Sequence, residues 1–180
     1  VVPAEKPAWM NRAWERIGEE VSAGHQAYVV CPRIEGDGGV VKIHDTLQHR
    51  TFRDLTVGML HGRMDPETKD QVKRDFAAGG IDVLVSTTVI EGGIDVANAT
   101  VMLILEADRF GVSQIHQLRG RVGRGGFASL CLLHTSFALD SPQMGRLQAI
   151  AATSDGFALS DLELKVRQEG DILGTSQSGS

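Results

Sequence analysis

Three arginines and several glycines are concentrated in one short stretch of the chain. Residues 115–125 read I-H-Q-L-R-G-R-V-G-R-G, which places Arg119, Arg121 and Arg124 within six positions. A guanidinium group is always charged and offers a rigid fork of donors that suits a phosphate. The intervening glycines let backbone and guanidinium groups close on a ligand. The stretch therefore favours a phosphate-contacting role over its alternative, a solvated basic helix end.

This arginine stretch is only half of a nucleotide site. No G-x-x-x-x-G-K-[ST] loop occurs in the 180 residues, and such a loop is what cradles nucleotide phosphates. We therefore expect the other half to come from another domain or subunit, in the way that an arginine finger is supplied. The six histidines and two cysteines show no metal-ligand spacing, so no metal site is predicted.

Polar residues follow four of the predicted strands. In an open parallel sheet, ligands bind outside the carboxyl ends of the strands. Each polar group alone could be a capping or turn residue, but their joint placement suits a surface that tracks a sugar–phosphate chain. The candidates for that surface are Arg33, His61, Gly62, Thr87 and Thr88, and a further polar group spans residues 106–109.

A glycine-bearing loop over residues 91–95 is a candidate ribose site. Asp95 would accept hydrogen bonds from the ribose hydroxyls, and Gly92 and Gly93 would permit a close approach. A turn in which Asp95 caps the next segment is an equally good interpretation of the same residues.

Apolar runs alternate with helical patterns along most of the chain. Strands are predicted for residues 27–31, 56–60, 81–86, 100–105 and 129–134, and helices for residues 9–23, 40–54, 65–76, 112–121 and 142–152. This alternation predicts an α/β fold, with a parallel sheet and helices on both faces. Residues 1–7 have the character of a linker. We assign residues 1–137 to the sheet domain and residues 138–180 to an appendage packed against it.

Composition narrows the class of protein. The formal net charge is −5, which argues against a free-standing, non-specific nucleic-acid binder but not against one basic stripe. Cys31 and Cys131 lie in apolar runs and are expected to be buried, reduced thiols of an intracellular protein. The apolar runs are too short to cross a membrane. The chain begins without methionine and ends in S-Q-S-G-S, so we expect an excised fragment.

Taken together, the motifs resemble the second motor domain of superfamily-two helicases, which has a RecA-like (P-loop NTPase-type) fold. Residues 117–124, Q-L-R-G-R-V-G-R, match the last motif of that superfamily, Q-x-x-G-R-x-G-R. Residues 83–95 match the motif before it, and residues 27–33 and 61–64 are similar to earlier strand-end motifs. The order along the chain is also that of the superfamily.

Within this superfamily, the chain most resembles the RecG family of branch-migrating DNA helicases. Residues 107–124 are shared in kind with RecG and with the Mfd-type transcription-repair coupling translocases. The ending, residues 155–164 and 170–179, favours RecG, whose family carries a helical hairpin and a coupling segment there.

The resemblance implies roles for individual residues. Arg121 and Arg124 would contact the γ-phosphate of ATP, and Gln117 would link that site to the DNA. Arg119 would serve the structure or the neighbouring hairpin. The ribose would lie against Gly93 and Asp95. The DNA backbone would contact Thr87 and Thr88, with Arg33, His61 and Gly62 as weaker candidates, and Thr175 and Gln177 would couple ATP hydrolysis to movement.

The implied function is that of a motor domain in an ATP-dependent DNA helicase that remodels stalled forks and Holliday junctions in recombination and repair. Its partners would be branched double-stranded DNA, ATP and the wedge and first motor domains, with no membrane. The Mg²⁺ ligands and Walker loop would lie on the first motor domain, so this chain alone is expected to be inactive. A cytoplasmic, nucleoid-associated bacterial protein is expected. The alternatives are an Mfd-type translocase domain and a non-catalytic nucleic-acid binding module.

Overall fold

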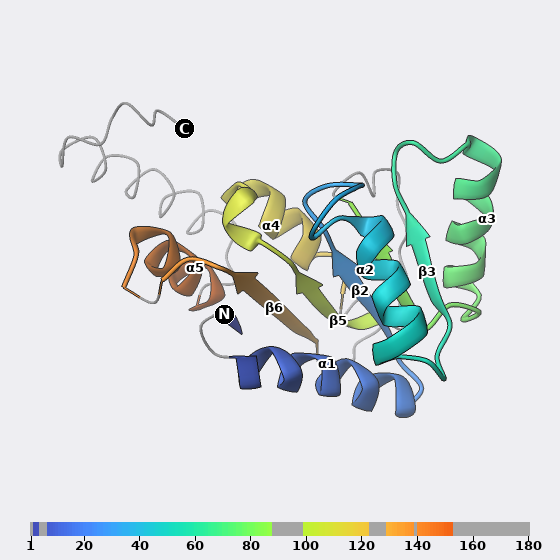
Figure 1. Cartoon of the computed structure of the whole chain (residues 1–180), viewed down its shortest axis with the longest axis horizontal. Coiled ribbons are helices and arrows are strands. Elements are labelled where there is room, and N and C mark those ends of the chain that lie inside the picture. The colour runs from blue at the N-terminus through green and yellow to red at the C-terminus, as the bar shows by residue number, and fades with distance from the viewer. Residues whose placement is uncertain (1, 4–6, 88–98, 123–128, 139, 153–180) are drawn as a thin grey trace.

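A six-stranded parallel sheet forms the centre of the molecule. The computed structural model describes residues 2–3, 7–87, 99–122, 129–138 and 140–152. The strand order is β1-β6-β5-β2-β4-β3, and every pairing is parallel (Figure 1). All six carboxyl ends therefore lie at one edge. The strands are β1 (Val2–Pro3), β2 (Gln26–Val30), β3 (Val57–Leu60), β4 (Val83–Ser86), β5 (Ala99–Ile104) and β6 (Leu130–Thr135).

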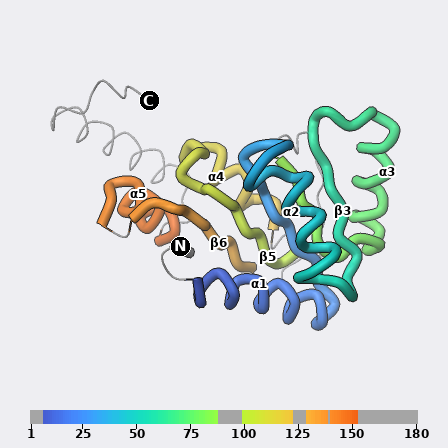
Figure 2. Tube along the Cα trace, viewed as in Figure 1, coloured from blue at the N-terminus to red at the C-terminus, as the bar shows by residue number. Residues whose placement is uncertain are grey.

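Helices cover both faces of this sheet and bury two separate cores. One face packs against α1 (Pro7–Ser22) and α2 (Val40–Thr46), which contribute Ile17 and Val40 to its core. The other face packs against three helices, α3 (Pro66–Ala77), α4 (Val112–Arg119) and α5 (Pro142–Ala152). The tube trace shows the same layering (Figure 2). The predicted α/β architecture is confirmed.

Strand β2 lies in the middle of the sheet and is buried on both faces. Its alternate side chains divide between the two cores: Tyr28 packs edge-on against Phe76 of α3, with ring centroids 5.0 Å apart. At the start of the strand, the buried amide of Gln26 donates to the carbonyls of Phe76 and Ile81, at 2.7 and 2.8 Å. The Gln26 amide thus links, by hydrogen bonds, the carboxyl-terminal end of α3 and the residues just before β4.

The helix boundaries follow the predicted capping residues closely. Asp65 caps α3 by accepting from the Thr68 N–H at 3.3 Å, and Pro66 occupies the first turn. Gly24 and Gly79 end α1 and α3 with φ of +92° and +85°. Residues other than glycine rarely adopt such angles, so the positions of these two glycines determine where the helices end.

The predicted helix over residues 40–54 is wrong in its second half. Helix α2 ends at Thr46 and continues as a π-helical turn over Leu47–Thr51. Side chains of this segment bond the outward-facing edge of β3: His44 Nε2 lies 2.8 Å from the Val57 carbonyl, and the Gln48 amide oxygen accepts from the Val57 N–H at 2.9 Å. These tertiary bonds favour the wider π-helical turn, with its i→i+5 bonds, over a regular α-helix.

The amino-terminal segment is not purely a linker. Val2 and Pro3 form β1, which pairs with β6 opposite His134 and Thr135. Two residues are too few to show a strand pattern in a sequence, and proline, which lacks an N–H, is tolerated at the edge of a sheet.

Helix α5 is the described part of the predicted appendage. It buries Met144, Leu147 and Ile150 completely, and the last two belong to the core beneath α4. Arg146 also donates to the Phe110 carbonyl at 2.7 Å. The remainder, residues 153–180, lies outside the described residues. None of the described helices is long and apolar enough to span a membrane.

Candidate nucleotide and nucleic-acid interface

The predicted strand-end residues lie along one edge of the sheet. Backbone bonds hold neighbouring ends in line: the Thr87 N–H donates to the Leu60 carbonyl at 3.3 Å, and the Cys31 N–H to the Ser86 carbonyl at 2.8 Å. The Leu105 N–H donates to Val30 at 2.9 Å. The sheet order then gives the sequence of loops along this edge, beginning after β3 at His61 and continuing through Thr87, Arg33 and Glu106.

Thr87 and His61 present different degrees of access. Thr87 is buried, with only 7% of its surface exposed. His61 is half-buried and accepts from the Arg63 N–H at its Nδ1, at 3.2 Å. Burial, followed by the charge of Arg63, lowers the pKa of His61, so its ring is neutral at neutral pH. Gly62 beside it is exposed.

Arg33 is engaged by the protein itself. Its Nη1 and Nη2 donate to the two carboxylate oxygens of Glu106 at 2.7 and 3.0 Å, a bidentate pair. Nη1 also donates to the Asp37 carbonyl. Hydrogen bonds from Arg33 lower the pKa of Glu106, so the carboxylate stays ionised. The fork that the sequence offers to a DNA phosphate therefore faces an internal carboxylate, and a DNA contact by Arg33 stays a prediction.

Glu106 is the centre of a larger network. Its backbone is left-handed, with φ 50° and ψ 51°, an uncommon conformation for a residue other than glycine. Arg109 donates a further hydrogen bond to the Glu106 carboxylate at 2.9 Å. The backbone N–H of Glu106 donates to His134 Nδ1 at 3.1 Å. Burial lowers the pKa of His134, which keeps this nitrogen free to accept.

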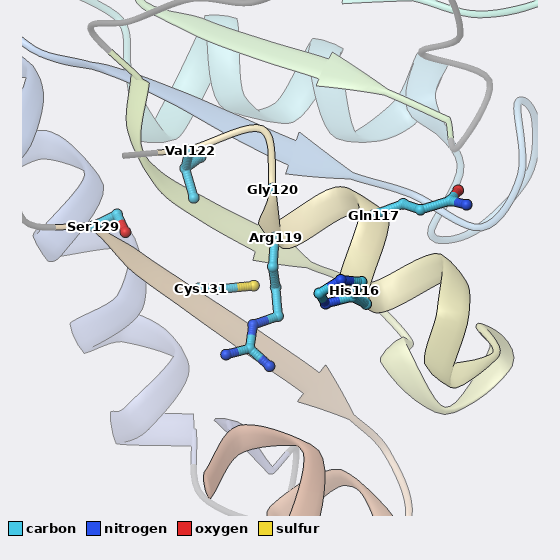
Figure 3. Close-up of a pocket in the computed structure, with 7 residues that line it drawn as sticks. All are labelled: His116, Gln117, Arg119, Gly120, Val122, Ser129 and Cys131. Carbon is cyan, nitrogen blue, oxygen red and sulfur yellow. The ribbon is translucent and has the colours of Figure 1, made fainter. Parts of the chain in front are cut away.

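Helix α4 presents the described part of the arginine stretch. Ile115 and Leu118 are buried against the sheet, Gln117 is exposed, and Arg121 follows the helix half-buried. Arg119 Nη1 donates to the Ile150 carbonyl of α5 at 3.1 Å. This bond supports the structural role predicted for Arg119, which stays a prediction. In Figure 3 its side chain extends towards β6, whereas that of Gln117 points away from it.

An open hollow of about 480 Å³ lies beside α4. Its lining comes from α4, from the turn after it and from β6, and consists of His116, Gln117, Arg119, Gly120, Val122, Ser129 and Cys131 (Figure 3). Burial raises the pKa of the Cys131 thiol to about 11, and that of Cys31 to about 12. Both free thiols are thus protonated; Cys31 is buried, as predicted, whereas Cys131 is only half-buried.

Several predicted site residues lie outside the described residues: Thr88, Gly93, Asp95, Arg124, Thr175 and Gln177. Their assignments stay predictions. Conversely, the sequence analysis identified residues 106–109 only as a polar group after a strand and missed the role of Glu106, whose partner Arg33 is 73 positions away. Among the described residues, no group of three or more His, Cys, Asp or Glu side chains could hold a metal ion.

Known proteins resemble this chain over nearly its whole length. The family model described as helicase conserved C-terminal domain matches residues 10–126. The ATP-dependent DNA helicase RecG of Mycobacterium tuberculosis H37Rv is 53% identical over 97% of this chain and 25% of the relative. RecG of Bacillus subtilis 168 is 41% identical over 94% of this chain and 26% of the relative. The chain thus spans about a quarter of the length of these curated relatives.

A solved structure gives the same result in three dimensions. RecG bound to a three-way DNA junction superposes with a TM-score of 0.77 and 41% identity, covering 95% of this chain and 22% of the other. This superposition extends well beyond the motifs. It confirms the RecA-like fold and the resemblance to RecG that the sequence indicated.

Proposed function

Because the chain belongs to the helicase conserved C-terminal domain family, we propose that it is the second motor domain of an ATP-dependent DNA helicase that remodels branched DNA. Relatives of this name and a RecG structure on a three-way junction support the proposal. The substrates would be stalled forks and Holliday junctions in recombination and repair. The wedge and first motor domains would belong to the rest of the protein, since the curated relatives are about four times longer than this chain.

One structural observation carries the proposal. The parallel sheet gathers the strand-end candidates His61 and Thr87 on the same edge from which the connection to α4 departs. Helix α4 then holds Gln117 exposed and is followed by Arg121. One short connection would therefore join the polar surface expected to bind a sugar–phosphate chain to the residues expected to face a nucleotide, and this supports a motor function.

We expect the nucleotide to be held mainly by another domain, and of the residues expected to contact it from this chain the structure describes Gln117 and Arg121. Bound ATP with Mg²⁺ supplies the phosphoryl group whose hydrolysis drives movement. Arg121 and Arg124 would contact the γ-phosphate, while Gly93 and Asp95 would approach the ribose. Gln117 would stand between the nucleotide and the DNA. With no phosphate-cradling loop in the sequence, we expect the chain alone to hydrolyse no ATP.

The competing functions have weaker support. An Mfd-type translocase is not favoured, because the similarity to RecG covers 97% of the chain. A non-catalytic nucleic-acid binding module would have no use for Arg121 and Arg124 together with Asp95.

The experiment is the substitution Arg124→Ala in the full-length protein. DNA binding should stay close to that of the wild type, while ATP turnover should fall by roughly 10³–10⁵, the range for an arginine finger in related phosphoryl-transfer systems. Turnover would be measured at saturating branched DNA, and DNA affinity by fluorescence anisotropy. A fall in turnover of less than tenfold would show that Arg124 is not the finger.

A further inference from the structure

We propose that Arg33, Glu106 and the loop between Arg33 and Gly39 position the nucleic-acid surface relative to α4. We call residues 33–39 together with Glu106 the edge clasp. This inference rests on the proposed function and adds to it a residue, Glu106, that would touch neither DNA nor ATP. Glu106 is a positioning residue rather than a catalytic one.

Arg33 is committed to the edge clasp by its bonding. Its two terminal nitrogens donate hydrogen bonds to the two carboxylate oxygens of Glu106, and Nη1 also donates to the Asp37 carbonyl. The side chains of Arg33 and Glu106 are only 32% and 22% exposed. A guanidinium so engaged would have to break a bidentate pair before it could bind a phosphate. The geometry therefore assigns Arg33 to holding the loop in place.

Gly38 packs closely against the Arg33–Glu106 ion pair. Its φ is +76°, and a Cβ placed on it would lie 2.6 Å from Glu106 Oε2 and 2.7 Å from Arg33 Nη1. Any larger residue would have to displace one member of the pair. Gly36, two positions earlier, has a similar φ of +81° but no atom within 4 Å of such a Cβ. The loop is thus in close contact with the ion pair at Gly38 and not at Gly36.

The edge clasp reaches the loops on both sides of β2. Glu35 lies 3.4 Å from Arg63, the second residue after the candidate His61. On the other side, Glu106 holds Arg109, and the connection to α4 is fixed further by the Thr135 hydroxyl, which donates to Asp108 at 2.7 Å. A contiguous chain of polar contacts therefore joins the β3 loop to the segment that carries α4.

This arrangement predicts which activities the edge clasp serves. Breaking the Arg33–Glu106 pair should let α4 shift relative to the strand-end candidates His61 and Thr87. The side chains of the expected DNA surface and of the expected nucleotide surface would themselves be unchanged. DNA affinity and ATP turnover without DNA should then change little. The stimulation of ATP turnover by DNA should fall, since it needs both surfaces in register, and a misplacement of about 1 Å can cost up to ~10²-fold in rate.

The test compares Gly38→Ala with Gly36→Ala in the full-length protein. Both substitutions place alanine at a similar positive φ, +76° and +81°, but only the Cβ of Gly38→Ala would collide with the ion pair. Turnover is counted per DNA-binding molecule, with and without branched DNA, so that a loss of folded protein is not mistaken for a slower enzyme. We expect Gly38→Ala to lower DNA-stimulated turnover about tenfold or more, with DNA affinity within about twofold, and Gly36→Ala to match the wild type.

Glu106→Gln provides a second, isosteric variant in case Gly38→Ala does not fold. It should reproduce the loss of DNA stimulation. The inference is overturned if Gly38→Ala behaves as Gly36→Ala and Glu106→Gln behaves as the wild type. It is also overturned if DNA affinity falls in parallel with turnover, which would make Arg33 a phosphate contact. A wild-type protein without DNA-stimulated turnover would instead refute the proposed function, and this inference with it.

Discussion

Replacing Arg119 with alanine separates the structural arginine from those expected to face a nucleotide. Arg119 Nη1 donates to the Ile150 carbonyl at 3.1 Å. The carbonyl that accepts this bond belongs to helix α5, whose described residues run from Pro142 to Ala152. The guanidinium therefore ties the carboxyl-terminal end of α4 to α5 through a hydrogen bond from a charged donor.

The expected loss of stability follows from this hydrogen bond. A hydrogen bond from a charged donor contributes about 1.5–3 kcal/mol to stability. Because Arg119 is half-buried, we take about 2 kcal/mol for Arg119→Ala, near the middle of the hydrogen-bond range. With a slope of about 2 kcal/mol/M, the urea midpoint should fall by about 1 M.

Urea unfolding of the 180-residue chain, followed by the fluorescence of Trp9 and Trp14, measures this shift. Arg53→Ala is the matched control, because Arg53 is exposed and should change stability by less than about 0.5 kcal/mol. In the full-length protein, Arg119→Ala should retain ATP turnover at a temperature where it is folded. An unchanged urea midpoint together with lost ATP turnover would refute this reasoning and make Arg119 a nucleotide contact.

Three other predictions address separate parts of the molecule. Gln26→Leu removes a buried donor from the Phe76 and Ile81 carbonyls and should cost about 1–3 kcal/mol in urea unfolding, whereas Gln71→Leu on the exposed face of α3 should cost little. Because burial lowers the pKa of His134 below 6.5, the unfolded chain binds a proton first, so stability is complete above pH 6.5 and should decline below it, by at most ~1.4 kcal/mol per pH unit. The measurement is urea unfolding at pH 7.5 and 5.5, and His134→Asn should reduce the difference. Thr175→Ala and Gln177→Ala should uncouple unwinding from ATP turnover in the full-length protein, and equal loss of both activities would count against a coupling role.

Local signals were sufficient for most of the fold. The strands around Val29 and Leu103 are short apolar runs because both faces of a parallel sheet are covered, and that pattern is visible in one sequence. Asp65, Gly24 and Gly79 marked helix boundaries by chemistry that acts within a few residues. That the strand-end candidates lie along one edge of the sheet could be predicted from the parallel arrangement alone.

Features that depend on distant partners were not predictable from local signals. The π-helical turn at Leu47–Thr51 depends on bonds to β3, and β1 depends on an open edge of β6. The edge clasp depends on Arg33 meeting a carboxylate 73 positions away. No spacing rule relates such residues, since the fold decides which strand ends become neighbours.

The bonds from α2 and the π-helical turn to Val57 have a consequence for association. Strand β3 lies at the outer edge of the sheet, and an outer strand with unpaired N–H and C=O groups is a template for pairing with another chain. His44 and Gln48 occupy both groups of Val57, so this position cannot accept a strand from a second molecule. We therefore infer that the π-helical turn also protects the protein against aggregation through this edge.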